Sequence, residues 1–254
     1  MSISQKNING LFVRYLEQQK DMFGDGFIMS TKQLNAIEQA MQPQNSSPFS
    51  ESNSGKITLV DFYHQIKECQ KCSLGKTRKN FVFGSGNPNA DAMFIGEAPG
   101  ADEDNVGKPF VGKAGQLLTK MLAAINFNRE DVFIANILKC RPPNNRDPLP
   151  EEVNECEPYL HRQIELIQPK VMMVLGRISG QTLLRTSDSL RDLRSKLNYY
   201  CDIPMIVTFH PAALLRNPNW KYNAWDDLKY FRKVYDVILA GDDPKDVIFE
   251  SNYK

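Results

Sequence analysis

From Ile57 onward, short apolar runs alternate with stretches in which apolar residues follow a helical period. The short runs predict buried β-strands, and the periodic stretches predict amphipathic helices. The predicted strands are Asp91–Gly96, Val132–Leu138, Val171–Leu175 and Met205–Thr208. The predicted helices are Ala114–Ile125, Glu151–Ile167, Ile178–Leu184 and Tyr222–Leu239. Pro150 suits the first turn of its helix, where no amide hydrogen bond is lost.

Strands that alternate with helices predict an α/β protein with three layers, α/β/α, around a central, mainly parallel, four-stranded sheet. In sheets of this kind, ligands bind beyond the carboxyl ends of the strands. The residues that follow each predicted strand are therefore the first candidates for function.

The chain is predicted to have two parts, a helical N-terminal extension with a linker at 1–55 and a main domain at 56–254. In the extension, Ile8–Phe23 and Thr31–Met41 are compatible with helices. Pro43–Ser54 is rich in Pro, Asn and Ser, which is typical of a linker.

Composition leaves the partner open. The formal net charge of +1 gives no overall attraction for polyanions, so a nucleic-acid site would need local basic clusters. A hydrophobic content of 41% and a charged content of 24% are those of an ordinary globular protein. No apolar run approaches the ~18 residues that cross a membrane, and the N-terminus lacks a signal-peptide pattern. These features predict a cytoplasmic protein without a membrane partner.

Four cysteines stand in two pairs, Cys69-x2-Cys72 and Cys140-x15-Cys156. In a reducing compartment, thiols gathered from two distant segments indicate a metal centre rather than disulfides. Their chemistry alone permits either zinc or an iron–sulfur cluster. Cys201 fits no ligand spacing and is predicted to be a buried free thiol.

The loop after the first strand carries several carboxylates and continues into Gly107–Gly115. The stretch Gly107–Ala114 nearly matches the nucleotide-binding pattern G-x4-G-K-[ST], but Ala114 stands where that pattern needs a hydroxyl. A nucleoside triphosphatase is therefore disfavoured. Gly112–Gly115 opens a predicted helix, whose free amides suit a phosphate.

The later strand ends add further candidates. Asn136 lies near the end of the second strand, directly before the basic, proline-stiffened loop Lys139–Pro143. The fourth strand is followed by His210–Asn217, which places an ionisable group, two leucines and an arginine within a few residues.

Together these motifs resemble the family 4 uracil-DNA glycosylases, iron–sulfur enzymes of the uracil-DNA glycosylase superfamily. The resemblance covers roughly 57–240 and includes the spacing of the cysteines. It is carried by Gly96–Gly100, Gly107–Gly115, Asn136 with Lys139–Pro143 and Arg146, and His210–Asn217. Where family 1 enzymes have Gln-Asp, this chain has Glu97-Ala98.

The resemblance implies a monofunctional DNA glycosylase that flips uracil out of DNA and hydrolyses its N-glycosidic bond in base excision repair. The implied partner is uracil-containing DNA, single- or double-stranded, and the implied state is a monomer. The resemblance also implies a [4Fe–4S] cluster with a structural role, on Cys69, Cys72, Cys140 and Cys156.

The resemblance assigns roles around the uracil base. Phe110, expected on an exposed loop, stacks on the ring, and Asn136 reads its hydrogen-bonding edge. His210 stabilises the charge that develops on the base. Because Ala98 stands where family 1 enzymes have the Asp that positions the water, that role falls to Glu97, to Glu103 or to a water held by backbone. Glu97, with its neighbour Ala98, is favoured for binding, and Glu103 is the weaker candidate for positioning the water.

A second set of residues is assigned to DNA. Leu214 aligns with the wedge that fills the gap left by the flipped base, and its neighbours support it. The set is Ser85, Gly112, Lys113, Lys139, Arg141, Leu214, Leu215 and Arg216.

Two other readings stay open on the sequence alone. One is a non-catalytic DNA-binding module that keeps the fold and the cluster, and the other is a zinc-ribbon nucleoside triphosphatase. The combination of Phe110, Asn136 and His210 argues against the first, and Ala114 argues against the second.

Overall fold

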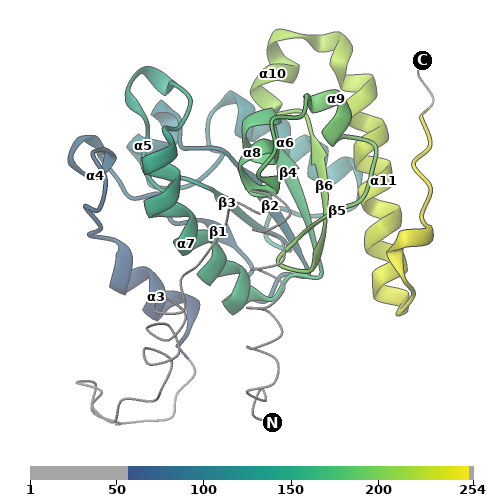
Figure 1. Ribbon diagram of the computed structural model, residues 1–254, viewed down its shortest axis with the longest axis horizontal. Coiled ribbons are helices and arrows are strands. Elements are labelled where there is room, and N and C mark those ends of the chain that lie inside the picture. The colour runs from purple at the N-terminus through teal and green to yellow at the C-terminus, as the bar shows by residue number, and fades with distance from the viewer. Residues whose placement is uncertain (1–56, 252–254) are drawn as a thin grey trace, which may run out of the picture. The chain divides into compact units, whose positions relative to one another are not determined.

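The structure, a computed structural model, describes residues 57–251 (Figure 1). The predicted helices Ile8–Phe23 and Thr31–Met41 lie outside the described residues, and the division at residue 55 stays a prediction. No helix within 57–251 is both long and apolar enough to span a bilayer. The predictions of a monomer and of a cytoplasmic location also stay predictions.

A six-stranded sheet with the order β1-β3-β2-β4-β6-β5 forms the centre of the domain. The four inner strands are parallel, and the two edge strands are antiparallel to their neighbours. The strands are β1 Ser85–Gly86, β2 Ala92–Gly96, β3 Phe133–Asn136, β4 Val171–Leu175, β5 Asn198–Tyr200 and β6 Ile203–Thr208. The prediction of a mainly parallel sheet is confirmed, but its four strands were too few. The edge strands β1 and β5 are too short to leave a pattern in the sequence.

Helices cover both faces of this sheet (Figure 1), so the three-layer α/β/α architecture is confirmed. The longer helices lie close to their predicted positions, with Pro150 in the first turn of its helix. The helices are α3 Leu59–Ile66, α4 Leu74–Thr77, α5 Ala101–Val106, α6 Lys113–Ala124, α7 Pro150–Ile167, α8 Arg177–Leu184, α9 Leu190–Leu193, α10 Pro211–Arg216 and α11 Lys221–Ala240. Single 3-10 turns span Pro143–Asn145, Pro218–Trp220 and Pro244–Asp246.

Two apolar cores lie on the two faces because side chains alternate along each strand. In β2, Met93 and Ile95 pack in the core that includes α3 and α7. Phe94, between them, packs in the core that includes α6 and α11. Every residue of β2 and β4 is buried, which explains why these strands appear in the sequence as continuous apolar runs.

The register of the parallel strands aligns their carboxyl ends. Gly96 of β2 pairs with Asn136 of β3, and Leu175 of β4 pairs with Thr208 of β6. The loops that follow these strands therefore meet at one edge of the sheet.

A buried ion pair braces the end of β6. Asp227 of α11 accepts hydrogen bonds from Thr208 Oγ1 (2.6 Å) and from Arg194 Nε (2.7 Å) and Nη2 (2.8 Å). The Arg194 guanidinium also lies 4.4 Å from the centre of the Phe209 ring. Burial raises the pKa of Asp227 to about 6, so the carboxyl group is ionised in mildly alkaline solution. This network fixes the backbone just before His210.

We expect Asp227→Ala to lower the free energy of unfolding by about 3–5 kcal/mol, because it leaves the Arg194 charge buried without its partner. The control is Asp236→Ala on the same helix, which breaks an exposed pair with Arg232 and should cost ~1 kcal/mol or less. Urea denaturation at about pH 8 measures both. Equal losses for the two variants would contradict the role given to Asp227.

Candidate functional site

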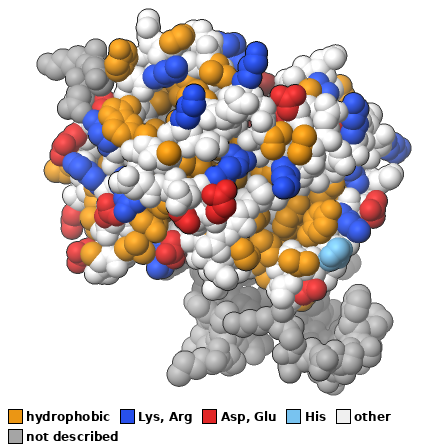
Figure 2. All heavy atoms as spheres, turned by 180° about the vertical axis from the view of Figure 1, so that it is seen from behind, with side chains coloured by type: hydrophobic (Ala, Val, Ile, Leu, Met, Phe, Trp, Pro, Cys, Tyr) orange, Lys and Arg blue, Asp and Glu red, His pale blue; other side chains and the backbone are white. Residues whose placement is uncertain are grey.

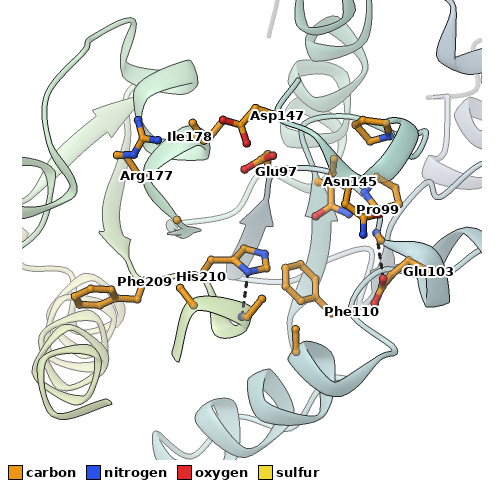
Figure 3. Close-up of a pocket in the computed structure, with 18 of the residues that line it drawn as sticks. Glu97, Pro99, Glu103, Phe110, Asn145, Asp147, Arg177, Ile178, Phe209 and His210 are labelled. Carbon is orange, nitrogen blue, oxygen red and sulfur yellow. Dashed lines mark hydrogen bonds between the residues drawn. The ribbon is translucent and has the colours of Figure 1, made fainter. Parts of the chain in front are cut away.

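A cavity of about 680 Å³ opens at the carboxyl edge of the parallel strands (Figure 3). Its volume lies within the range of pockets that hold small-molecule ligands. The lining includes Glu97 after β2, Asn136 at the end of β3, and His210 after β6, together with Phe110. The structure thus brings together these four residues that the sequence analysis singled out from separate loops.

Asn136 lines the cavity and is buried, with 2% of its surface exposed. Among the buried side-chain polar atoms of 57–251, its Oδ1 is the one without a hydrogen-bond partner. A buried acceptor left unpaired is costly, so such an atom indicates a missing ligand. Gly96 makes room for it, since a Cβ at Gly96 would collide with Asn136 Oδ1 and with the Phe110 ring.

Phe110 forms a wall of the cavity. Its ring is buried, with 6% of the residue exposed, which corrects the expectation of an exposed loop. The ring centre lies 5.6 Å from that of the His210 imidazole, at an angle of 31°. Phe110 has a φ of +50°, and the adjoining helix α6 packs so close that a Cβ at Gly115 would collide with the Phe110 carbonyl. The turn that presents the ring is therefore tightly constrained.

His210 caps the N-terminus of α10 and is held in one tautomer. Its Nδ1 accepts a hydrogen bond from the backbone amide of Ala212 at 3.1 Å, so the proton of the neutral ring is on Nε2. Burial, followed by the positive charge of Arg216, lowers the pKa of His210 to about 4. At neutral pH the side chain is an uncharged imidazole that donates through Nε2.

Glu97 is half-buried on the opposite side of the cavity from α10, near Asp147 (Figure 3). Burial, and then the negative charge of Asp147, raise the pKa of Glu97 to about 7, while Arg177 opposes the shift. A carboxyl group that titrates near neutrality is suited to holding or moving a proton. Its neighbour Ala98 lines the same cavity.

Glu103 has a different role from the one expected. Its Oε1 accepts hydrogen bonds from the backbone amides of Val111 (2.9 Å) and Gly112 (3.1 Å). Its Oε2 accepts one from the amide of Gly100 (3.1 Å). Both oxygens are engaged by backbone, so the assignment of Glu103 to a water molecule does not fit. The carboxylate instead joins the loop after β2 to the loop that carries Phe110 (Figure 3).

With this geometry in place, comparison with known proteins is informative. Residues 83–232 match the model of the uracil DNA glycosylase superfamily. The chain belongs to the uracil DNA glycosylase superfamily. The resemblance seen in the sequence is confirmed.

Individual relatives place the chain near one branch of the superfamily. It is 46% identical over 180 residues to a type-4 uracil-DNA glycosylase of Archaeoglobus fulgidus, a match that covers 68% of this chain and 90% of that protein. It is 48% identical over 185 residues to the type-4 enzyme of Saccharolobus solfataricus, covering 69% and 84%. For the type-4 enzyme of Thermotoga maritima the identity is 43% over 155 residues, covering 60% and 81%.

Two residues that the superfamily resemblance assigned to DNA are buried. Lys139 has no exposed surface, and its Nζ donates to the carbonyl of Asn136 (2.7 Å) and to Gln163 Oε1 (2.6 Å). Leu214 is 1% exposed and packs in the core beside α6 and α11, whereas the next side chain, Leu215, is 43% exposed. The assignments of Lys139 to phosphate and of Leu214 to the wedge are therefore wrong for this conformation.

The other members of that set lie in varied settings. The Gly112 amide, expected to be free for a phosphate, is already bonded to Glu103. Lys113 and Arg216 are exposed, and Arg216 lines the cavity. Ser85 is half-buried in the edge strand β1, and Arg141 Nε donates to Asn145 Oδ1 at 2.8 Å.

Cys69, Cys72, Cys140 and Cys156 line one small cavity, as their spacing predicts. Hydrogen-bond donors surround the sulfurs: Tyr159 Oη lies 3.2 Å from Cys69 Sγ, and the Lys139 amide lies 3.2 Å from Cys156 Sγ. Within 57–251, no set of three or more His, Cys, Asp or Glu side chains has the arrangement of a metal-ion site.

Sequence reasoning missed two charged residues of the cavity, Asp147 and Arg177. Arg177 begins α8, one residue after Gly176, which follows β4. The rule that ligands bind beyond strand ends could have found it. Asp147 comes from the irregular loop before α7, so no periodic signal marks it.

Proposed function

We propose that this protein is a monofunctional uracil-DNA glycosylase that hydrolyses the bond between uracil and deoxyribose in base excision repair. The observation that carries the proposal is the buried, unpartnered Oδ1 of Asn136 in the same cavity as a neutral His210. The names of the relatives described above support the same assignment.

Asn136 explains the choice of base. Uracil presents a donor at N3 and an acceptor at O4, and the side-chain amide of Asn136 offers the matching acceptor and donor. Cytosine presents the opposite pattern at these atoms. A mismatched pair would leave buried polar groups without partners, at a cost of about 1–3 kcal/mol for each group.

His210 stabilises the leaving group. When the bond from N1 to C1′ breaks, its electron pair passes to the uracil ring and negative charge develops on O2. A neutral imidazole that donates through Nε2 stabilises this charge by a hydrogen bond, without transferring a proton. The bond from the Ala212 amide to Nδ1 holds the ring in the required tautomer.

Glu97 is the carboxylate we assign to the attacking water. In its ionised form it orients the water oxygen toward C1′ and accepts a proton as the new C–O bond forms. Its negative charge also offsets the positive charge that develops on the sugar. Because both oxygens of Glu103 accept hydrogen bonds from backbone amides, we assign the water to Glu97, one of the options that the sequence left open.

Contact with DNA rests on local features rather than on overall charge. Lys and Arg side chains are spread over the face shown in Figure 2, with acidic and hydrophobic side chains between them. Beside the cavity, the exposed Leu215 and Arg216 provide an apolar side chain and a cation. We assign Leu215 to the space left by the flipped nucleotide and Arg216 to a neighbouring phosphate.

We assign the four cysteines to an iron–sulfur cluster, as the family resemblance implies, rather than to zinc. A single zinc ion needs four sulfurs at about 2.3 Å from one point, whereas each cysteine of a [4Fe–4S] cluster binds a different iron. Four thiols that line one cavity could supply one thiolate to each iron of such a cluster. Cys69, Cys72, Cys140 and Cys156 would hold the cluster, which would join two distant segments and take no part in the reaction.

The function is tested with an oligonucleotide that contains one uracil, followed by alkali, which cuts the strand wherever the base has been lost. We expect the protein to expose the strand to cleavage at uracil and to leave an oligonucleotide with cytosine at that position intact. His210→Ala should lose about 10²–10³ in kcat while still binding the oligonucleotide. His64→Ala, on an exposed position of α3, is the matched control. Binding without uracil release by the unaltered protein would favour the non-catalytic module.

The pH dependence separates the two ionisable groups of the cavity. We expect kcat/KM to rise as pH increases through about 7 and then level off, because Glu97 must lose its proton and its pKa is raised to about 7. His210 has a pKa lowered to about 4, so it stays neutral across this range. Glu97→Gln should lower the plateau and remove the limb near neutrality. If the limb persisted unchanged in the variant, another group would be responsible.

The cluster is tested by visible absorbance. We expect the purified protein to absorb in the visible range and to bleach with dithionite, which zinc would not do. Cys156→Ser should lose this absorbance, whereas Cys201→Ser should retain it as the matched control. Retained absorbance in Cys156→Ser, or zinc in place of iron in the metal content, would contradict the assignment.

A further inference from the structure

A chain of polar contacts lies at the opposite edge of the sheet from the cavity, between α7 and the hairpin of β5 and β6. Cys201 Sγ lies 3.3 Å from His161 Nδ1. His161 Nε2 lies 2.7 Å from the Tyr200 hydroxyl, which lies 2.9 Å from Glu157 Oε1. None of these residues lines the cavity of the proposed glycosylase.

The hairpin turn holds the thiol in place. Cys201 and Asp202 form the link between β5 and β6, with φ values of +53° and +61°. Two left-handed residues are typical of the tight hairpin turn that normally contains Asn and Gly. Cys201 is exposed, which corrects the prediction of a buried thiol. The turn requires a left-handed backbone conformation that cysteine rarely adopts. Because the Cys201 sulfur also contacts a histidine, we infer a role for this side chain.

The hydrogen bonds determine where the protons lie. Glu157 is buried and accepts from Arg185 Nη2 at 2.7 Å, so it is paired as a carboxylate. The Tyr200 hydroxyl donates its one proton to Glu157 and must therefore accept from His161 Nε2. With Nε2 protonated, Nδ1 is left to share a proton with the Cys201 thiol.

The groups around His161 favour its protonated form. The titratable groups that contact His161 are Cys201 and Glu157, with Arg185 beyond Glu157. Contacts with Cys201, and then with Glu157, raise the pKa of His161 to about 10. An imidazolium is therefore expected at neutral pH, with its Nδ1–H directed at Cys201 Sγ.

We propose that Cys201 is a reactive thiolate, paired with the His161 imidazolium, that exchanges with low-molecular-weight disulfides. In this step the thiolate attacks one sulfur of R–S–S–R. A bond forms between Cys201 Sγ and that sulfur while the original S–S bond breaks, and the electron pair leaves on R–S⁻. The oxidising equivalent comes from the disulfide, so no other reactant is required.

The arrangement supports this reading because it contains each part of an activated nucleophile. Cys201 is the exposed nucleophile, His161 is the base within hydrogen-bond reach, and Tyr200 and Glu157 orient the base. An unpaired thiol has a pKa of about 8.5 and is mostly protonated at neutral pH. The inference is independent of the proposed glycosylase activity, because the contacts lie at the other edge of the sheet.

The test is the rate at which full-length, metal-loaded protein reacts with dithiodipyridine, an aromatic disulfide, followed by its absorbance. We expect one fast thiol, located at Cys201 by mass spectrometry and absent in Cys201→Ser. Its rate should change little between about pH 6 and 8, whereas an unpaired thiol would lose about tenfold per unit below its pKa. Uracil release by Cys201→Ser should equal that of the unaltered protein.

The matched variant is His161→Gln, which should react at least about tenfold more slowly at pH 6 and regain the profile of an ordinary thiol. The Cys201 rate in Tyr200→Phe should lie between those of the unaltered protein and His161→Gln, because this change removes the hydroxyl that orients His161. A Cys201 rate in the unaltered protein that rises about tenfold per pH unit up to 8.5 would overturn the proposal. An unchanged profile in a folded His161→Gln would also overturn it.

Discussion

The parallel register of the four inner strands is the constraint on which the cavity depends. Pairing of Gly96 with Asn136 brings the end of β2 beside the end of β3, and the pairing of β4 with β6 brings the His210 loop to the same edge. A slip of one residue would turn the side chain at Asn136 to the other face of the sheet. Burial of both faces opposes such a slip, since each strand would lose its fit to both cores. The apolar interior thus sets the positions of the polar groups.

Removal of water from this edge then determines the protonation of the groups that it gathers. Burial destabilises charge, so it keeps His210 neutral and raises the pKa of Glu97. The same effect gives the two groups different chemical roles. The imidazole becomes a hydrogen-bond donor that cannot repel a developing sugar cation, and the carboxyl group becomes a base that titrates near neutrality. Burial thus sets the protonation of both His210 and Glu97 for the proposed reaction. Within 57–251, the Oδ1 of Asn136 has no hydrogen-bond partner and can accept a hydrogen bond from a ligand.

The sequence was sufficient for the layers, the inner strands and most of the cavity, because buried strands and long helices leave periodic patterns and ligands bind at strand ends. It was insufficient where two neighbouring residues compete for one role. The sequence does not distinguish which of Leu214 and Leu215 faces the core. Because α10 begins at Pro211, Leu214 lies on its buried face and Leu215 is exposed. Glu103 likewise required coordinates, since a carboxylate that binds three amides looks the same in sequence as one that binds water.

The buried position of Lys139 changes how the cysteine cavity relates to the proposed active site. A cation in a basic loop suggests phosphate binding, yet its ammonium group donates to the carbonyl of Asn136 and its amide lies against Cys156 Sγ. Lys139 also directly precedes Cys140. A cluster bound to Cys140 and Cys156 would therefore fix the backbone of Lys139 through both cysteines. Because the carbonyl and side chain of Asn136 share one Cα, a shift of the cysteine loop would move the side chain that we propose reads the base. The proposed cluster would then act on base recognition through Lys139, rather than by presenting that lysine to DNA.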